Sequence, residues 1–471
     1  MPFNTYTFLV FFLAVVLIYQ LLPGWKLQKT ILLISSYIFY ASWNPVFVFL
    51  LFISTISDWF IARFIYESDT QNRKKLFVYL SLIVNLGLLG YFKYGNFLVD
   101  NFSVLAAIAG INFQPVDYDI LLPVGISFYT FQTLSYTIDV YRGKIRPALS
   151  FLDYALYVSY FPQLVAGPIV RADDFLPQCV SPKKVTADQF GWGLALIIIG
   201  LFMKTCLSDT VFAPVVDTVF SQPAASQAID IWTALFSFSG QIYCDFAGYS
   251  TIAIGTALCF GFVLPRNFSS PYSALGFSDF WHRWHISLST WLRDYLYISL
   301  GGNRTSTFRT YVNLMLTMLI GGLWHGASWM YVIWGGIHGL YLVIEKMICS
   351  LITRPVRLSP FTEYLLILVT FVAVSFTWLF FRADSMQTVA LLLTNIFSSS
   401  GQGTLAMREI NLALACVLLV VSWHVYSRNQ SIGEFFKKFP PYARGVIMFS
   451  LVLIIYLFAS GDDRAFIYFQ F

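Results

Sequence analysis

The chain has 471 residues, of which 58% are apolar, 19% aromatic and only 11% charged. Soluble globular proteins are about half apolar and about a quarter charged, so this composition excludes an ordinary soluble protein and predicts a polytopic membrane protein. The formal net charge of +5 fits the Lys and Arg enrichment of cytoplasmic loops, so we expect a lipid bilayer, and no nucleic acid, as a partner. Apolar segments recur from end to end, which predicts one integral-membrane domain over residues 1–471.

A helix that crosses the hydrocarbon needs about 17 to 25 mostly apolar residues. That template recurs along the chain and predicts an all-α transmembrane bundle of about 11 to 14 spans, with additional re-entrant or interfacial helices. The first 25 residues lack the basic region of a cleaved signal, so we expect them to remain as the first span. Basic residues follow the first and third expected spans, which places those two loops in the cytoplasm. The expected spans are 5–23, 28–43, 46–65, 76–93, 119–141, 150–168, 190–207, 228–244, 249–265, 310–325, 329–347, 363–381, 410–427 and 443–460.

Two segments interrupt this pattern. Residues 121–130 and 161–171 place Pro and Gly inside apolar stretches. Such breaks free backbone groups that lipid cannot satisfy, so both segments are predicted to be re-entrant or to line a cavity.

The segment 279–300 differs from a span. Its Trp, Leu, Tyr and Ile residues recur every three or four positions, which predicts one amphipathic helix at the membrane interface or in the mouth of a cavity. Because an α-helix turns by about 100° per residue, His285 falls at the boundary of the apolar face and His282 falls on the solvent-facing side. Glycines at the start of 301–304 would cap the end of this helix.

His325 is the leading candidate for chemistry. It lies in a stretch between Arg309 and Glu345 that contains no Asp, Glu, Lys or Arg. A titratable imidazole at membrane depth is costly unless it is paired or functional. Glycines on both sides of His325 would let a backbone or a thin ligand approach closely. We therefore interpret His325 as a general base for a hydroxyl that attacks an acyl carbon; the alternative is an imidazole hydrogen-bonded to a carbonyl within the bundle.

Five further positions carry weaker signals. His285 would position a donor thioester, polarise its carbonyl or share the proton, and the alternative is an interfacial histidine with ordinary solvation. His338 lies between glycines, which favours a packing or supporting role. Asp245 follows an uncharged stretch, and an internal salt bridge or a helix cap is favoured slightly over catalysis. Asn303 and Arg304 are structural by default, although they could meet an anionic donor headgroup.

A metal centre is not expected. His282 and His285 are three residues apart, but no HExxH motif and no paired cysteines accompany them.

Several long motifs carry a family resemblance. The chain contains FWHRWHISLSTWLRDYLYISLGGNR and GGLWHGASWMYVIWGGIHG, and further motifs lie at 122–143, 161–171 and 243–255. These motifs resemble the membrane-bound O-acyltransferases, and within them the bacterial members that acetylate alginate and other exported polysaccharides. The resemblance covers most of the chain and is densest from 240 to 345. The chain departs from the usual pattern at His282, where Arg is expected, and at Thr251, where Asp is expected.

The resemblance implies that His325 is the family's essential histidine inside a central tunnel and that His285 is its second characteristic histidine. It also implies a bacterial inner-membrane location, a cytoplasmic acetyl donor such as acetyl-CoA with no bound cofactor, an extracytoplasmic acetyltransferase partner protein, and a polysaccharide acceptor.

Our hypothesis is therefore acetyl transfer across the inner membrane, with His325 and His285 as the catalytic residues. Two alternatives stay open: transfer of D-alanyl or another acyl group to teichoic acid or peptidoglycan, and a non-catalytic transporter. The residues expected to contact substrates are Arg283, Trp284, Asn303, Arg304, Trp324, His338 and Asp245.

Overall fold

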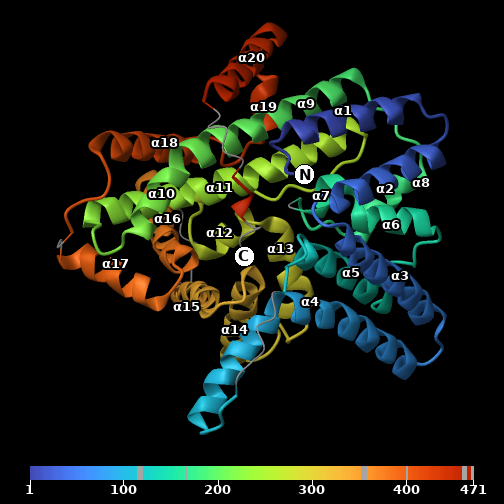
Figure 1. Ribbon diagram of the computed structural model, residues 1–471, viewed down its shortest axis with the longest axis horizontal. Coiled ribbons are helices and arrows are strands. Elements are labelled where there is room, and N and C mark those ends of the chain that lie inside the picture. Colours follow the sequence, from blue (N-terminus) through green and yellow to red (C-terminus); the bar gives the residue numbers. More distant parts are fainter. Residues whose placement is uncertain (114–119, 166, 352–357, 399–400, 459–463, 468–471) are drawn as a thin grey trace. The chain divides into compact units, whose positions relative to one another are not determined.

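The computed structural model describes residues 1–113, 120–165, 167–351, 358–398, 401–458 and 464–467 (Figure 1). Within these ranges the regular elements are all helices, which confirms the all-α prediction. Seven of the described helices are long and apolar enough to span a membrane, as expected of a multi-pass membrane protein. The larger count of 11 to 14 spans stays a prediction. The seven candidates are Pro45–Glu67, Gln71–Ile108, Ala187–Ser221, Trp329–Leu351, Pro360–Arg382, Met407–Tyr426 and Pro441–Phe458.

The helices fall into two compact units, which we describe separately. The first unit comprises residues 1–194 and 253–265. Helix α3 packs against α4 and α5, and α2 packs against α6. The helices of this unit are α1 (Tyr6–Leu21), α2 (Trp25–Ala41), α3 (Pro45–Glu67), α4 (Gln71–Ile108), α5 (Ile126–Tyr141), α6 (Phe151–Ser159), α7 (Phe161–Leu164), α8 (Ala172–Val180), the start of α9 (Ala187–Leu201) and the end of α11 (Ala228–Cys259).

The second unit comprises residues 195–252 and 266–471. Its tightest pair is the antiparallel hairpin of α14 and α15, and α16 packs on α15. Besides the rest of α9 and α11, its described helices are η1 (Phe202–Phe212), α10 (Ala213–Ser221), η2 (Pro271–Ser273), α12 (Phe277–Arg283), α13 (Ile286–Trp291), η3 (Leu292–Tyr297), α14 (Thr307–His325), α15 (Trp329–Leu351), α16 (Pro360–Arg382), α17 (Met386–Ser398), α18 (Met407–Tyr426), α19 (Ile432–Lys437) and α20 (Pro441–Phe458).

The starts of several long helices follow from local sequence. Asn44 caps α3 by accepting a hydrogen bond from the Val46 N–H, and proline occupies the first helical position. Ser359 caps α16 in the same way, again directly before a proline. A short polar side chain satisfies an amide at the helix start, and proline has no amide to satisfy, so both residue types favour initiation there.

Helix α4 is longer than expected. The predicted span ended at residue 93, whereas α4 continues to Ile108 and has 38 residues. The chain has no proline between Gln71 and Ile108, so the polar residues after position 93 do not interrupt the helix.

Both predicted interruptions of the apolar pattern are confirmed as breaks in helical structure. Residues 121–125 precede α5, and α7 has only four residues, after which residues 165 and 167–171 are not helical. The two segments pack together: Gly125 has φ +77°, and a Cβ there would lie 2.7 Å from the carbonyl oxygen of Leu164. The side chain of Gln163 donates to the carbonyl of Tyr157 at 2.7 Å. The non-helical residues 165 and 167–170 are buried within protein, as the absence of water in lipid requires.

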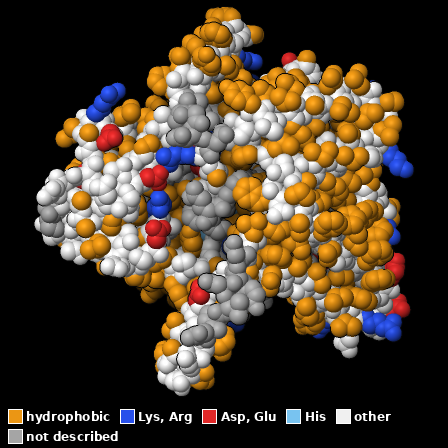
Figure 2. Space-filling view, in the orientation of Figure 1, with side chains coloured by type: hydrophobic (Ala, Val, Ile, Leu, Met, Phe, Trp, Pro, Cys, Tyr) orange, Lys and Arg blue, Asp and Glu red, His pale blue; other side chains and the backbone are white. Residues whose placement is uncertain are grey.

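The surface is rich in exposed apolar side chains. Figure 2 shows hydrophobic side chains over much of the visible face. Leu13 on α1, Phe49 on α3 and Phe449 on α20 are 56%, 68% and 70% exposed. A soluble monomer rarely exposes so much continuous apolar surface, whereas a bilayer covers it.

Candidate active site

The hairpin of α14 and α15 positions His325. Helix α14 starts on a Ser306 cap and ends at His325, because Gly326 is extended with φ −163° and ψ 151°. The two helices touch through glycines: a Cβ at Gly322 would lie 2.2 Å from the carbonyl oxygen of Tyr331, and one at Gly335 would lie 2.3 Å from that of Met318. Small residues therefore allow the backbones to meet, as the sequence suggested.

His325 is buried, with 3% of its surface exposed, inside a shell of aromatic rings. The ring centroids of Trp324 and Trp334 each lie 5.1 Å from that of His325, and that of Phe381 lies 5.5 Å away. The His285 ring lies 6.5 Å away. The two predicted catalytic histidines thus come together in a site largely shielded from water, where electrostatic interactions are strong.

The segment predicted as one amphipathic helix is not continuous. It consists of α12, α13 and the π-helix η3. His285 separates α12 from α13 in the left-handed conformation, with φ 42° and ψ 54°. His282 is exposed as predicted, but the placement of His285 at an interfacial boundary is wrong, because His285 is fully buried. A helical wheel fails across such a break in the helix.

Asn267, 18 positions upstream in the sequence, contacts His285. The Nδ1 atom of His285 lies 3.2 Å from Oδ1 of Asn267, and the His285 ring makes an edge contact with Phe246 at 4.6 Å. Burial lowers the pKa of His285 to about 3. The imidazole is therefore neutral near pH 7.

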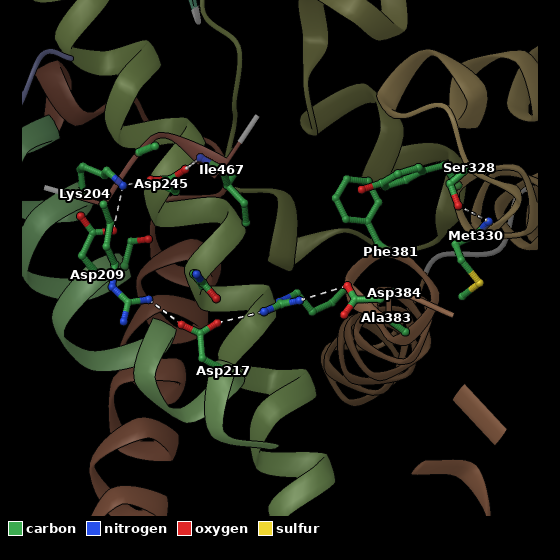
Figure 3. A pocket seen from close by; sticks show the side chains of 16 residues that line it. Lys204, Asp209, Asp217, Asp245, Ser328, Met330, Phe381, Ala383, Asp384 and Ile467 are labelled. Atoms are coloured by element: carbon green, nitrogen blue, oxygen red, sulfur yellow. Dashed lines mark hydrogen bonds and ion pairs between the residues drawn. The ribbon is translucent and has the colours of Figure 1, made fainter. Parts of the chain in front are cut away.

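A polar cavity of about 520 Å³ lies near His325 (Figure 3). Phe381, which contacts the His325 ring, forms part of its wall. In Figure 3, Phe381 and Ser328 lie across the cavity from Lys204. The lining residues are Lys204, Ser208, Asp209, Asp217, Gln241, Asp245, Ser328, Met330, Tyr331, Phe381, Arg382, Ala383, Asp384, Arg464, Ala465 and Ile467.

The charges of this cavity are organised in two clusters. Lys204 lies 2.8 Å from Oδ1 of Asp209 and 2.6 Å from Oδ1 of Asp245. Lys204 and Asp209 are five residues apart in the π-helix η1, whose wider turn brings such positions together. The favoured reading of Asp245 as a salt-bridge residue is confirmed. In the second cluster, Asp217 accepts hydrogen bonds from Arg382 at 3.0 Å and from Arg464 at 2.6 Å.

A second cavity of about 290 Å³ adjoins the aromatic shell. Trp281 lines this cavity and lies 5.9 Å from Trp334, which in turn contacts His325. The walls are mostly apolar, with His282 and Arg293 among the polar lining residues. The lining residues are Ser278, Trp281, His282, Ile286, Ser289, Thr290, Leu292, Arg293, Tyr297, Leu314, Thr317, Met318 and Leu342.

The other residues expected to contact substrate lie in different surroundings. Trp324 lies between the two histidines, 5.1 Å from His325 and 5.9 Å from His285. Trp284 is buried and packs on other rings, including Trp378 at 5.5 Å. His338 is buried, and its Nε2 lies 3.0 Å from Oγ1 of Thr377, in line with the supporting role favoured for it.

Arg283 is held in place by protein contacts. It pairs with Asp279 at 2.8 Å and donates to the carbonyls of Ser269 and Arg428. Although burial opposes the shift, hydrogen bonds from Leu275 N–H and Arg283 lower the pKa of Asp279. Asn303 and Arg304 are exposed after the predicted glycine cap, where Gly301 and Gly302 have φ +106° and +57°.

Sequence reasoning missed Lys204, Asp209 and Asn267. Lys204 stands inside an expected span, and a charge at that depth is a signal for function that was available. Asn267 carried no such signal, since asparagine is neutral and lies far from His285 in sequence. Among the described residues, no group of three or more His, Cys, Asp or Glu is arranged to hold a metal ion.

Comparison with known proteins assigns the family. A protein-family model described as MBOAT, membrane-bound O-acyltransferase family, matches residues 144–382, which include His285 and His325. The chain is 42% identical over 415 residues to the probable alginate O-acetylase AlgI of Pseudomonas aeruginosa, covering 88% of this chain and 77% of that protein. It is 34% identical over 530 residues to the peptidoglycan O-acetyltransferase of Helicobacter pylori, covering 100% and 97%. It is 26% identical over 267 residues to a teichoic acid D-alanyltransferase of Streptococcus thermophilus, covering 53% and 63%. The chain belongs to the membrane-bound O-acyltransferase family and is an O-acyltransferase.

Proposed function

We propose that this protein moves an acetyl group from acetyl-CoA at the cytoplasmic face to an acceptor hydroxyl on the opposite face, for O-acetylation of an extracytoplasmic polysaccharide such as alginate. One observation carries the proposal: His325 lies in an aromatic shell that two separate cavities adjoin. Phe381 joins the shell to the polar cavity, and Trp334 with Trp281 joins it to the apolar cavity. The polysaccharide class is taken from the names of the relatives.

The two cavities lie toward opposite ends of the hairpin. Along α14, Leu314 lines the apolar cavity, and His325 follows it by about 16 Å at ~1.5 Å per residue. Along α15, Met330 lines the polar cavity, and Leu342 lines the apolar one about 18 Å further on. Substrates that enter from opposite ends would therefore meet near His325.

The charges at the ends of this hairpin support an orientation in the membrane. Arg304 and Arg309 flank the start of α14, and Lys346 lies near the end of α15. Residues 325–331, which join the two helices at their other ends, contain no Lys or Arg. The positive-inside rule then puts the apolar cavity on the cytoplasmic side. Its apolar walls suit the uncharged arm of a thioester donor, and Arg293 with Arg304 would meet donor phosphates.

The reaction needs one base that also returns its proton. The acceptor O–H gives its proton to the His325 imidazole, and its oxygen forms a bond to the acetyl carbonyl carbon. The carbon–sulfur bond then breaks, and the departing thiolate takes the proton from the imidazolium. The products are an acetyl ester and free coenzyme A thiol, with His325 neutral again. The polar cavity, with the hydroxyl of Ser208 and the amide of Gln241 in its wall, suits an acceptor hydroxyl delivered by a saccharide or by a periplasmic partner protein.

Labelled donors test this function. Purified protein in proteoliposomes would receive acetyl-CoA or a D-alanyl thioester carrying radiolabel in the acyl group, with an oligosaccharide acceptor on the opposite side. We expect acetyl ester on the acceptor and release of one thiol per ester. Labelling from the D-alanyl donor alone, which the similarity to the D-alanyltransferase raises as an alternative, would reject acetyl transfer. Absence of acyl transfer from any donor would favour a transporter.

A further inference from the structure

The tautomer of His285 can be deduced from its hydrogen bonds. The side-chain atom of Asn267 that lies 3.2 Å from Nδ1 of His285 also lies 3.3 Å from the backbone nitrogen of Ser287 and 2.9 Å from its hydroxyl. A backbone N–H only donates, so this Asn267 atom must be the carbonyl oxygen. The amide nitrogen of Asn267 faces the other way and donates to the Ser250 hydroxyl at 3.3 Å, which fits the same orientation.

Oδ1 of Asn267 only accepts hydrogen bonds, so the atom that it contacts on His285 must be a donor. Nδ1 of His285 must therefore carry the proton, and in the neutral ring Nε2 carries a lone pair. The surrounding contacts hold Asn267 in this orientation. Asn267 is 1% exposed, and its backbone carbonyl accepts a hydrogen bond from the Ile286 N–H at 2.9 Å. This second bond holds the backbone directly after the left-handed His285.

We infer that Asn267 is a positioning residue that fixes the proton of His285 on Nδ1, so that His285 takes part in acyl transfer as a proton acceptor. A neutral imidazole in this tautomer has no N–H left to polarise the thioester carbonyl. Of the three roles considered for His285, this tautomer excludes polarising the carbonyl through an N–H and allows sharing the proton with His325, whose ring lies 6.5 Å away. The role in the reaction rests on the proposed function, but the tautomer does not.

Nitrogen-15 NMR of the full-length protein tests the tautomer without turnover. The chain has five histidines, so histidine-labelled protein in nanodiscs, compared with His285→Gln, would assign the His285 signals. We expect a protonated Nδ1 and an unprotonated Nε2. Asn267→Leu should abolish this preference, Asn267→Asp should retain it, and Ser250→Ala, which leaves the Oδ1 contacts in place, should leave it unchanged. A proton on Nε2 in the wild-type protein, or an unchanged tautomer in Asn267→Leu, would overturn the inference.

Kinetic constants of Asn267 variants distinguish a loss of His285 positioning from general structural damage. Partners that hydrogen-bond the second ring nitrogen of metal-bound histidines typically contribute about 10- to 100-fold, and we expect the same scale for Asn267. We expect Asn267→Leu to lower kcat by about that factor with little change in KM for the donor, and Asn267→Asp to recover most of the loss. Equal loss in both variants would contradict positioning through the acceptor oxygen. If no variant and no wild-type preparation transfers acetyl groups while the tautomer is as inferred, only the proposed function fails.

Discussion

Lys204 shows at the residue scale how the polar cavity is held together. It is 1% exposed and lies within 3 Å of carboxylate oxygens of both Asp209 and Asp245. Removing water from a charge is costly, and only a close partner of opposite sign offsets that cost. Removing the central cation therefore leaves two buried carboxylates without their counter-ion.

We predict that Lys204→Met lowers the free energy of unfolding by about 3–5 kcal/mol. The matched control is Lys144→Met, because Lys144 also pairs with an aspartate, Asp139, but is 50% exposed. Water still reaches the Lys144 ammonium, although the Asp139 carboxylate is only 6% exposed, so this pair should contribute less than the fully buried cluster. Thermal unfolding of both variants in the same detergent checks the difference. Equal midpoints in the two variants would show that the buried cluster stabilises the protein no more than the partly exposed pair does.

His285 should give stability a dependence on pH. Its folded-state pKa of about 3 lies below the ordinary value of 6.5, so the unfolded chain binds more protons between these values. The contribution is complete above pH 6.5 and is lost as the pH falls toward 3. Between pH 7.5 and pH 5 this amounts to about 2 kcal/mol. We expect His285→Gln to reduce the fall in thermal midpoint over that interval; a variant with the wild-type slope would refute a neutral, buried His285.

Some residues of the site could be predicted from the sequence and others could not, for a physical reason. His325 stood out because titratable groups are rare in apolar stretches, and the structure places it in the aromatic shell. The support for His285 could not be read from the sequence, because an asparagine 18 positions upstream reaches it only through a left-handed backbone turn. Spacing rules describe regular helices and carry no information about such a turn.

At the scale of elements, the glycine contact between α14 and α15 sets the position of His325. Gly335 has no room for a side chain, because a Cβ would lie 2.3 Å from the carbonyl oxygen of Met318. Its neighbour Gly336 has ordinary room, with Leu319 at 3.4 Å. The adjacent glycines therefore differ in what a single methyl group would do.

We predict that Gly335→Ala forces the two helices apart and lowers stability by about 1–3 kcal/mol, the usual cost of overpacking. Because Trp334 contacts the His325 ring, acyl transfer should fall as well. Gly336→Ala should change neither property by more than a small amount. Thermal midpoints and turnover, measured at matched protein levels, check this; indistinguishable variants would mean that the hairpin tolerates separation.

Element boundaries followed the sequence where local chemistry fixes them. The caps at Asn44 and Ser359 are recognisable from polar residues before prolines, and the glycines after η3 end the helical segment as expected. The stripe predicted for 279–300 is divided by the break at His285, so that Trp281 lies in α12 whereas Leu288 and Trp291 lie in α13. The extension of α4 to Ile108 was missed because hydropathy marks a membrane span and not the end of a helix.

At the scale of the whole molecule, the account requires two entrances on opposite sides of the membrane. His282 in the wall of the apolar cavity is exposed, and Ser328 in the wall of the polar cavity is partly exposed. Either residue can carry a cysteine probe once the exposed Cys349 has been replaced by serine.

We predict that a membrane-impermeant maleimide labels Ser328→Cys in intact spheroplasts and His282→Cys only in inside-out vesicles. The physical reason is the assignment of the basic ends of the hairpin to the cytoplasm. The Cys349→Ser parent measures background labelling. Labelling of both cysteines from one side would contradict entry from opposite faces.

The central claim is that the buried imidazole of His325 performs the acyl transfer. The direct measurement is the acetate esterified to exported polysaccharide in cells that carry His325→Ala as their only copy, with membrane abundance quantified in the same cells. His424→Ala is the control, because it changes another buried histidine that lines neither cavity and whose Nδ1 accepts a hydrogen bond from the Tyr272 N–H. The account predicts loss of polymer acetylation in His325→Ala at normal abundance, with near-normal acetylation in the control. Normal acetylation in His325→Ala at normal abundance would contradict it.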